Sequence, residues 1–248
     1  MTAAILIIAG SLLAQVIAHE AAHAVAMRRN GIRVEEAGIG FWRPRLAFRW
    51  RDVLWTLSPW LLGAYVSAPE GTDLTKLKWR PMTWILNSGI VVNLITGTAF
   101  LTALAAVNGR WTTFGVMLVL TTTLIACRYE VAAYVVPALG PIALGWLLFI
   151  LAGPMLAGAP TGFAATAPLA EIGVSPAWVL EVNAGIGLGL ALLNAAPLGA
   201  TDNGQVWNRI LRDRFGERAS TVYLIAGLAV LAVLLGYAVI RDLLSFAL

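Results

Sequence analysis

Six long apolar stretches divide this chain, and they constrain its fold more than any other feature. They cover residues 3–27, 82–107, 114–127, 131–156, 178–198 and 220–240. An apolar helix needs about 20 residues to cross a bilayer, and most of the six come close to that length. The third stretch is short, and Pro137 and Pro141 interrupt the fourth. The pattern predicts an all-α polytopic membrane protein with about six transmembrane helices.

The composition agrees with a membrane protein. Apolar residues make up 59% of the chain and charged residues only 12%, whereas a soluble domain carries about 25% charged residues. No repeat and no low-complexity linker divides the sequence. We therefore expect a single membrane-embedded domain over residues 1–248.

The basic residues are distributed unevenly between the loops. If six spans cross the membrane in alternating directions, 15 of the 17 lysines and arginines lie on one side of it. Only Arg110 and Arg241 lie on the other side. The positive-inside rule then places the majority in the cytoplasm and both termini outside. This arrangement explains the net charge of +4 through contact with the lipid bilayer. We expect no nucleic-acid partner.

The first apolar stretch contains the motif H-E-x-x-H. His19 and His23 are the only histidines in the chain, and Glu20 follows the first of them. Residues four apart share one face of a helix, so both imidazoles can bind one metal ion. Glu20 points about 100° away, where a general base for the attacking water belongs. Ionisable groups in hydrocarbon are costly, which favours a functional role over a buried polar pair.

A catalytic zinc ion usually takes three protein ligands, and Asp202 is the best candidate for the third. Pro197 should end the fifth helix, and the glycines nearby would let the chain turn back toward the metal. The same Asp-Asn-Gly sequence is also ordinary turn chemistry. The predicted topology favours a ligand, because spans one and five both end near the cytoplasmic face.

Three other residues could supply the third ligand, and each is a weaker candidate. Glu130 neighbours Arg128, with which we expect it to form an ion pair at the membrane boundary. Glu181 begins a span on the opposite side of the membrane. Cys127 ends an apolar stretch and has no accompanying motif.

Taken together, these motifs resemble those of the site-2 protease family of intramembrane zinc metalloproteases. That family combines H-E-x-x-H with N-x-x-P-x-x-x-x-D-G near the end of a later span, and Asn194, Pro197 and Asp202 match the second pattern. The glycine arrives one residue late, behind Asn203. The resemblance implies one Zn²⁺ per chain held by His19, His23 and Asp202, with Glu20 as the catalytic base.

The resemblance also implies further features of the fold and the site. It predicts a small membrane-associated β-hairpin over residues 31–66, after the first helix. The segment 88–93 is similar to the family's G-P-x-x-N element, with Ile90 in place of proline. We expect Asn93 and Asn194 to donate hydrogen bonds to the substrate backbone or to the oxyanion. No segment is long enough for a PDZ or CBS domain.

Residues 46–50 alternate apolar and basic or small side chains, which predicts a strand. Its free edge would pair with an extended substrate beside the site. An equally good interpretation is a simple interfacial anchor, because tryptophans are common at headgroup level.

The resemblance implies an intramembrane zinc endopeptidase that cleaves the transmembrane segments of single-span membrane proteins in regulated intramembrane proteolysis. We expect it in a bacterial or archaeal plasma membrane, with its active site toward the cytoplasm and a regulatory membrane partner. Two alternatives remain at this point. One is a polytopic metal-binding transporter, which needs no general base at Glu20. The other is an inactive protease-like membrane scaffold, against which the intact motif argues.

Overall fold

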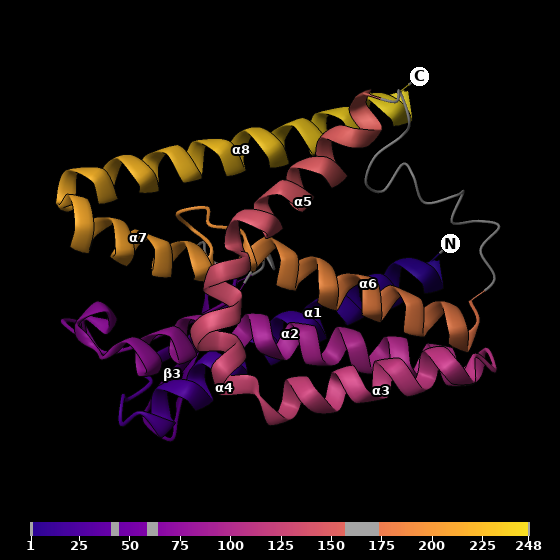
Figure 1. Cartoon of the computed structure of the whole chain (residues 1–248), viewed down its shortest axis with the longest axis horizontal. Coiled ribbons are helices and arrows are strands. Elements are labelled where there is room, and N and C mark those ends of the chain that lie inside the picture. Colours follow the sequence, from indigo (N-terminus) through magenta and orange to yellow (C-terminus); the bar gives the residue numbers. More distant parts are fainter. Residues whose placement is uncertain (1, 41–44, 59–63, 157–173, 248) are drawn as a thin grey trace.

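Helices dominate the structure, a computed structural model that describes residues 2–40, 45–58, 64–156 and 174–247. Helical residues account for 75% of the structure. The helices are α1 (Thr2–Arg29), α2 (Trp79–Val107), α3 (Trp111–Ala126), α4 (Arg128–Glu130), α5 (Val136–Leu156), α6 (Pro176–Ala195), α7 (Asp202–Phe215) and α8 (Glu217–Ala247), with a 3-10 turn η1 (Leu74–Lys76) and a π-helical turn η2 (Val131–Val135). Figure 1 shows α2, α3 and α6 running along the long axis, with α5 crossing them.

In the part of the chain that the structure describes, four helices are long and apolar enough to cross a membrane. They are α1, α2, α6 and the helix over Arg128–Phe149, which runs through α4, η2 and α5. The third predicted stretch forms α3, which has only 16 residues. The sixth lies in α8, which is not among the four within the part of the chain that the structure describes. The chain is therefore a multi-pass membrane protein, but the predicted count of six spans is not confirmed.

The fourth predicted stretch is continuous, because tryptophans compensate for its prolines. Pro137 and Pro141 have no N–H, which leaves the carbonyls of Ala133 and Pro137 without their α-helical donors. Trp79 Nε1 donates to the Ala133 carbonyl at 3.0 Å, and Trp207 Nε1 donates to the Pro137 carbonyl at 3.2 Å. The helix therefore passes through the π-helical turn η2 without breaking.

Among the described residues, a four-stranded sheet follows α1, and the predicted β-hairpin is one part of it. The strands β1 (Glu36–Ile39), β2 (Leu46–Trp50), β3 (Val53–Leu57) and β4 (Ala64–Ser67) stand in the order β2-β3-β1-β4. The hairpin of β2 and β3 exists, around Arg51 and Asp52 at positive φ. β1 adds in parallel to β3 and also pairs antiparallel with β4. A lone hairpin is marginal in stability, whereas the wider sheet buries Ala37 and Val53 in one cluster with Met27 of α1.

The predicted strand at residues 46–50 is confirmed as β2. It forms one edge of the sheet, and all five of its residues are exposed. The strand that packs against α1 is β4, at the opposite edge. Residues 41–44 and 59–63 of the predicted hairpin region lie outside the described residues.

Helix α2 lies at the centre of the fold and packs against α1, α3 and α6. Its backbone approaches α6 closely at two glycines, since a Cβ added to Gly187 would lie 3.1 Å from the Cα of Gly97. Small residues permit such close helix packing in membranes. The middle of α2 is thereby placed between α1 and α6.

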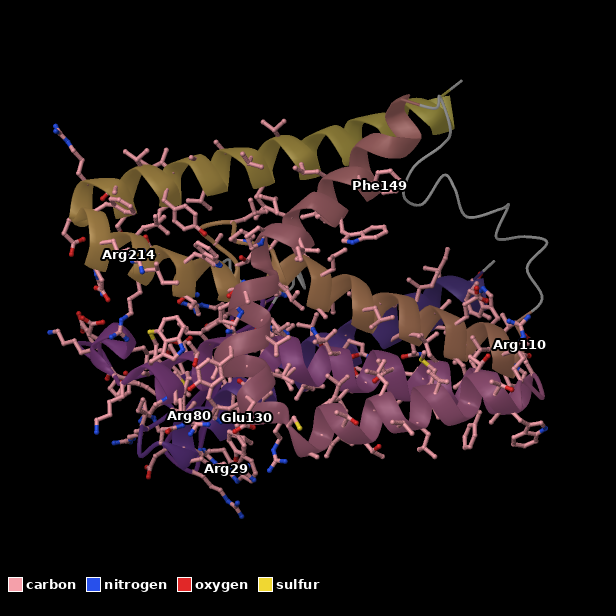
Figure 2. All side chains as sticks on the ribbon, viewed as in Figure 1. Arg29, Arg80, Arg110, Glu130, Phe149 and Arg214 are labelled. Atoms are coloured by element: carbon pink, nitrogen blue, oxygen red, sulfur yellow. The ribbon has the colours of Figure 1, made fainter. Side chains whose placement is uncertain are left out.

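The labelled arginines separate into two groups along the bundle. Arg29, Arg80 and Arg214 lie toward one end, and Arg110 lies at the other (Figure 2). This is the grouping that alternating spans predict for these four residues.

Candidate metal centre

The two histidines of the motif face one another on α1. The Nε2 atoms of His19 and His23 are 3.1 Å apart, and their ring centroids are 4.8 Å apart. His19 is buried at 6% exposure, and His23 is half-buried. The helical spacing therefore directs both imidazole edges to one point inside the bundle.

Asp202 reaches this point because α6 stops and α7 starts nearby. α6 ends at Ala195, and Ala196 adopts an extended conformation immediately before Pro197, as the sequence predicted. Thr201 then caps α7, since its Oγ1 accepts a hydrogen bond from Gly204 N at 3.1 Å. Asp202 is thus the first residue of α7.

Gly204 comes one residue later than the glycine of the N-x-x-P-x-x-x-x-D-G pattern, and it still serves this turn. A Cβ at this position would lie 1.9 Å from the Leu198 carbonyl oxygen, so only glycine fits. Asn203, which stands where the family pattern has its glycine, is fully buried and donates to the Ala195 carbonyl at 2.7 Å. The departure from the motif therefore leaves a well-anchored loop.

The three candidate ligand atoms have the separations that a tetrahedral zinc site requires. Asp202 Oδ2 lies 2.9 Å from His19 Nε2 and 3.4 Å from His23 Nε2. Two ligands at about 2.0–2.1 Å from a tetrahedral zinc ion are roughly 3.3 Å apart. His19, His23 and Asp202 can therefore hold one metal ion with little rearrangement.

The carboxylate of Asp202 is also chemically suited to a metal. Its Oδ2 atom is buried and accepts no well-formed hydrogen bond from the described residues, although both imidazoles are close. An ionised, buried oxygen without a hydrogen bond is satisfied when it binds a cation.

His23 is held from behind by α2. Its Nδ1 lies 2.6 Å from the Ile85 carbonyl oxygen, and Ser88 Oγ is 3.3 Å from the same nitrogen. Because a carbonyl only accepts, Nδ1 carries the proton and Nε2 keeps its lone pair for a metal. Such a backbone partner is typical behind a metal-binding histidine.

Asn93 occupies the equivalent position behind His19. Its side chain is fully buried, with its amide nitrogen 2.9 Å from His19 Nδ1, and its Oδ1 has no partner among the described residues. The two ends of an amide are assigned from the hydrogen-bond network. With the amide turned over, Oδ1 accepts from Nδ1–H, and His19 Nε2 is free for a metal. The structure thus places Asn93 against a candidate ligand, and its expected hydrogen bond to the substrate stays a prediction.

Gly89 makes room for the His19 ring. A Cβ at Gly89 would lie 2.4 Å from His19 Nε2 and 2.5 Å from Cε1. Ser88 and Gly89 belong to the segment 88–93, which resembles the family's G-P-x-x-N element. That resemblance does not say which face of the helix meets α1, and no role was predicted for Ile85, Ser88 or Gly89.

The other predicted residues take different positions. Glu20 is half-buried on α1, directly after His19 in the chain. Asn194 is half-buried and donates to Leu190 in its own helix at 3.1 Å. The structure leaves the roles predicted for these two residues untested.

The acidic residues that were considered as alternatives lie elsewhere. Glu130 pairs with Arg80 at 3.1 Å, so the prediction of an ion pair with Arg128 was wrong. Arg128 instead donates to the Ile125 carbonyl at 2.7 Å and stacks over a neighbouring ring. Glu181 is exposed near the start of α6. Among the described residues, only His19, His23 and Asp202 form a group that could hold a metal ion.

The fold and this centre together define a multi-pass membrane protein with a His-His-Asp group of metal-binding geometry. The model of peptidase family M50 matches residues 7–235, nearly the whole chain. The chain belongs to peptidase family M50, which is the site-2 protease family, and it is therefore a membrane metalloprotease. No curated protein matches the chain.

Proposed function

We propose that the chain is an intramembrane zinc endopeptidase that cleaves the transmembrane segments of single-span membrane proteins. The observation that carries the proposal is the convergence of His19, His23 and Asp202 within 3.4 Å of one another. His19 and His23 lie in a helix that is long and apolar enough to span a membrane. A zinc ion in this group would act as a Lewis acid and lower the pKa of water toward neutrality.

The protein's own residues divide the remaining chemistry. His19 and His23 present Nε2 because Asn93 and Ile85 engage the opposite nitrogens. The Glu20 carboxylate is placed to take a proton from the attacking water. It then returns that proton to the nitrogen of the departing amine. Asn194 remains our candidate for hydrogen bonding to the substrate backbone.

An apolar cavity among the helices supports a membrane-embedded substrate. It has a volume of about 470 Å³ and lies between α2, η2, α5 and α6, with Ile90, Leu94 and Ala191 in its wall. Ile90 directly follows Gly89, which contacts His19. A substrate helix hides its carbonyls in its own hydrogen bonds, so it must unwind locally before cleavage.

We further infer that the site faces the cytoplasmic half of a cell membrane, where its products would serve signalling by regulated intramembrane proteolysis. His23 lies six residues before Arg29, or about 9 Å along the helix. The end of the bundle that holds Arg29, Arg80 and Arg214 would be cytoplasmic by the positive-inside rule (Figure 2).

The direct test is cleavage of a single-span model substrate by the full chain in lipid vesicles. We expect cleavage within the span, loss of cleavage after chelation, and recovery when zinc is added back. A substrate with asparagine or glycine in its span should be cut faster than one with leucine there, because it unwinds more readily. Cleavage that survives complete zinc removal would contradict the proposal.

A further inference from the structure

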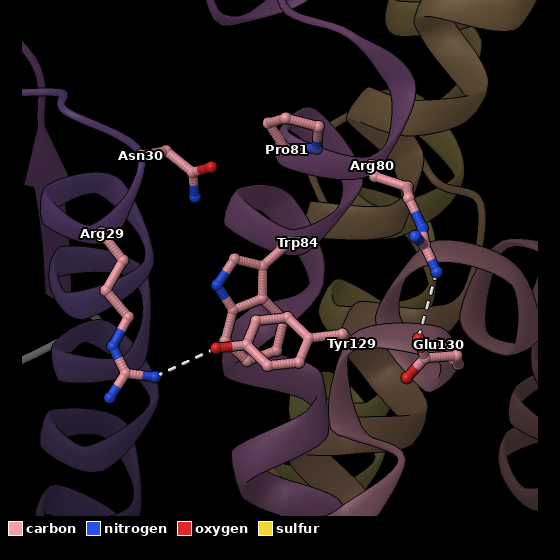
Figure 3. A pocket seen from close by; sticks show the side chains of 7 residues that line it. All are labelled: Arg29, Asn30, Arg80, Pro81, Trp84, Tyr129 and Glu130. Atoms are coloured by element: carbon pink, nitrogen blue, oxygen red, sulfur yellow. Dashed lines mark hydrogen bonds and ion pairs between the residues drawn. The ribbon is translucent and has the colours of Figure 1, made fainter.

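A second cavity, of about 380 Å³, lies at the basic end of the bundle, and its lining includes none of the candidate metal ligands. It is enclosed by the end of α1, the start of α2 and the short helix α4 (Figure 3). Its walls include Arg29, Asn30, Arg80, Trp84, Tyr129 and Glu130. None of these residues takes part in the chemistry described above.

Three candidate spans end or begin at this cavity. The first ends at Arg29, the second begins at Trp79, and the third begins at Arg128. The cavity therefore lies at the boundary between hydrocarbon and headgroups. Phosphate groups of lipids are found at this level, where basic residues and aromatic belts meet them.

The cavity is built from hydrogen-bond donors. Arg29 donates to Tyr129 Oη at 3.2 Å, and Arg80 pairs with Glu130 at 3.1 Å. A guanidinium has five N–H groups, so each arginine keeps further donors for a ligand. The two arginines and one glutamate leave one net positive charge in the wall, which matches the single negative charge of a phosphodiester.

The indole of Trp84 gives independent evidence that the cavity takes a ligand with hydrogen-bond acceptors. Its side chain is buried at 8% exposure, and its Nε1–H has no hydrogen-bond partner among the described residues. Figure 3 shows the indole nitrogen turned toward the α1 wall, where Arg29 and Asn30 stand. A buried donor without an acceptor is costly, and an anion in the cavity would satisfy it.

The N-terminus of α2 adds an electrostatic field that attracts anions. α2 has 29 residues, and its N-cap residue, Lys78, makes no side-chain hydrogen bond to the first turn. An uncapped helix N-terminus carries partial positive charge and attracts anions. Arg80 and Trp84 stand on the first two turns of this helix and face the cavity.

We propose that this cavity binds one phosphodiester group, that of an anionic phospholipid headgroup at the membrane surface. The ligand oxygens accept from Arg29 and the Trp84 indole, which face each other across the cavity (Figure 3). Arg80 stands on the other side of the Trp84 and Tyr129 rings and adds positive charge, which Glu130 offsets in part. The same chemistry would admit free phosphate, so the experiment has an arm for each source.

The test purifies the full chain in a nonionic maltoside detergent, which carries no phosphodiester, adds phosphatidylglycerol, and counts retained phosphatidylglycerol by native mass spectrometry. Wild type should retain one molecule. Arg29→Gln and Trp84→Phe should each weaken retention about tenfold, as loss of a charge-assisted or buried hydrogen bond implies. Arg80→Gln should weaken it less, because it removes only a nearby positive charge. Glu130→Gln should strengthen retention, because the net charge of the wall rises. Unchanged zinc content and melting temperature show that each variant is folded.

Arg28→Gln is the matched control, because Arg28 is exposed beside Arg29 and does not line the cavity. It should retain the lipid as wild type does. If it loses the lipid as much as Arg29→Gln, binding is only general surface charge and the proposal fails. Binding of inorganic phosphate alone, with the same dependence on Arg29 and Trp84, would support the phosphate chemistry and assign free phosphate as the source. No retention of either probe would overturn the proposal.

Discussion

At the scale of single residues, the geometry of His19 depends on two neighbours on α2. Asn93 holds one nitrogen of the ring at 2.9 Å, and Gly89 leaves the space in which the ring lies. Both residues belong to α2, on the face that meets α1. The ligand set is therefore organised by α2 as much as by the motif that contains the histidines.

Replacing Asn93 should weaken metal binding without removing a ligand. Asn93→Leu deletes the acceptor behind His19 and should reduce zinc affinity about 10–100-fold. Asn93→Asp keeps an acceptor and should restore most of that affinity. The measurement is zinc binding by competition with a chromophoric chelator. Asn87→Leu is the control, because Asn87 is equally buried on α2 but bonds to the Ala132 carbonyl. Equal losses in the two leucine variants would refute the positioning role.

Adding one methyl group at Gly89 should displace His19. The new Cβ would stand 2.4 Å from His19 Nε2, so the ring must rotate or the helices must separate. We expect Gly89→Ala to retain less than half of the wild-type zinc after dialysis, while Gly115→Ala, which has open space around it, retains all of it. Full zinc occupancy in Gly89→Ala would show that α1 and α2 adjust more freely than this packing implies.

At the scale of elements, the helix through α4, η2 and α5 depends on donors from other helices. Trp207 Nε1 bonds to the Pro137 carbonyl, and the same helix α7 begins at Asp202. This bond joins the element that carries the third candidate ligand to a helix with two prolines. The stability of α5 and the placement of Asp202 are therefore linked.

Removing the indole donor should leave a buried carbonyl unpaired. Trp207→Phe keeps an aromatic ring and should lower the free energy of unfolding by about 1–3 kcal/mol. Trp111→Phe, at a 69% exposed position, should change it little. Denaturant unfolding in a mild detergent measures both. If the two variants have the same stability, the tryptophan does not compensate for the proline.

Substitutions in strand β2 can distinguish an edge that pairs with substrate from a simple interfacial anchor. Proline placed in turn at residues 46–50 removes one backbone donor each time and should slow cleavage where that donor faces a substrate strand. Zinc content should stay the same, since the candidate ligands lie on α1 and α7. Cleavage at the wild-type rate in all folded variants would identify β2 as an interfacial anchor.

The sequence predicted the local elements better than their assembly. Apolar length located the helices, Pro197 located the end of α6, and alternation located β2, because each depends on residues near one another in the chain. The parallel pairing of β1 with β3 joins strands that are separated by β2, and no local pattern specifies it. The tryptophans that donate hydrogen bonds to η2 and α5 come from α2 and α7. The sequence of the fourth stretch does not contain them, so its prolines predicted an interruption.

At the scale of the whole molecule, the candidate site also combines residues that a local pattern predicts with residues that only the assembled fold brings together. His19, Glu20 and His23 follow from the spacing of one helix. Asp202 followed from the absence of a third histidine and from the Asn194 spacing, and the fold does bring it to the other two. Asn93 was selected for a different role, because its contact with His19 depends on how α1 and α2 rotate against one another. Gly89 matters for the same reason and was not selected.

The central claim is that one group of residues holds zinc while Glu20 performs proton transfer. It is tested most directly by measuring zinc content and cleavage together in purified wild type, Glu20→Gln and Asp202→Ala. Wild type should hold about one zinc per chain and cleave a single-span substrate. Glu20→Gln should hold the same zinc and lose activity by orders of magnitude, because the base is gone and the ligands remain. Asp202→Ala should lose both zinc and activity. Cleavage by Glu20→Gln at the wild-type rate, or full zinc content in Asp202→Ala, would contradict the account.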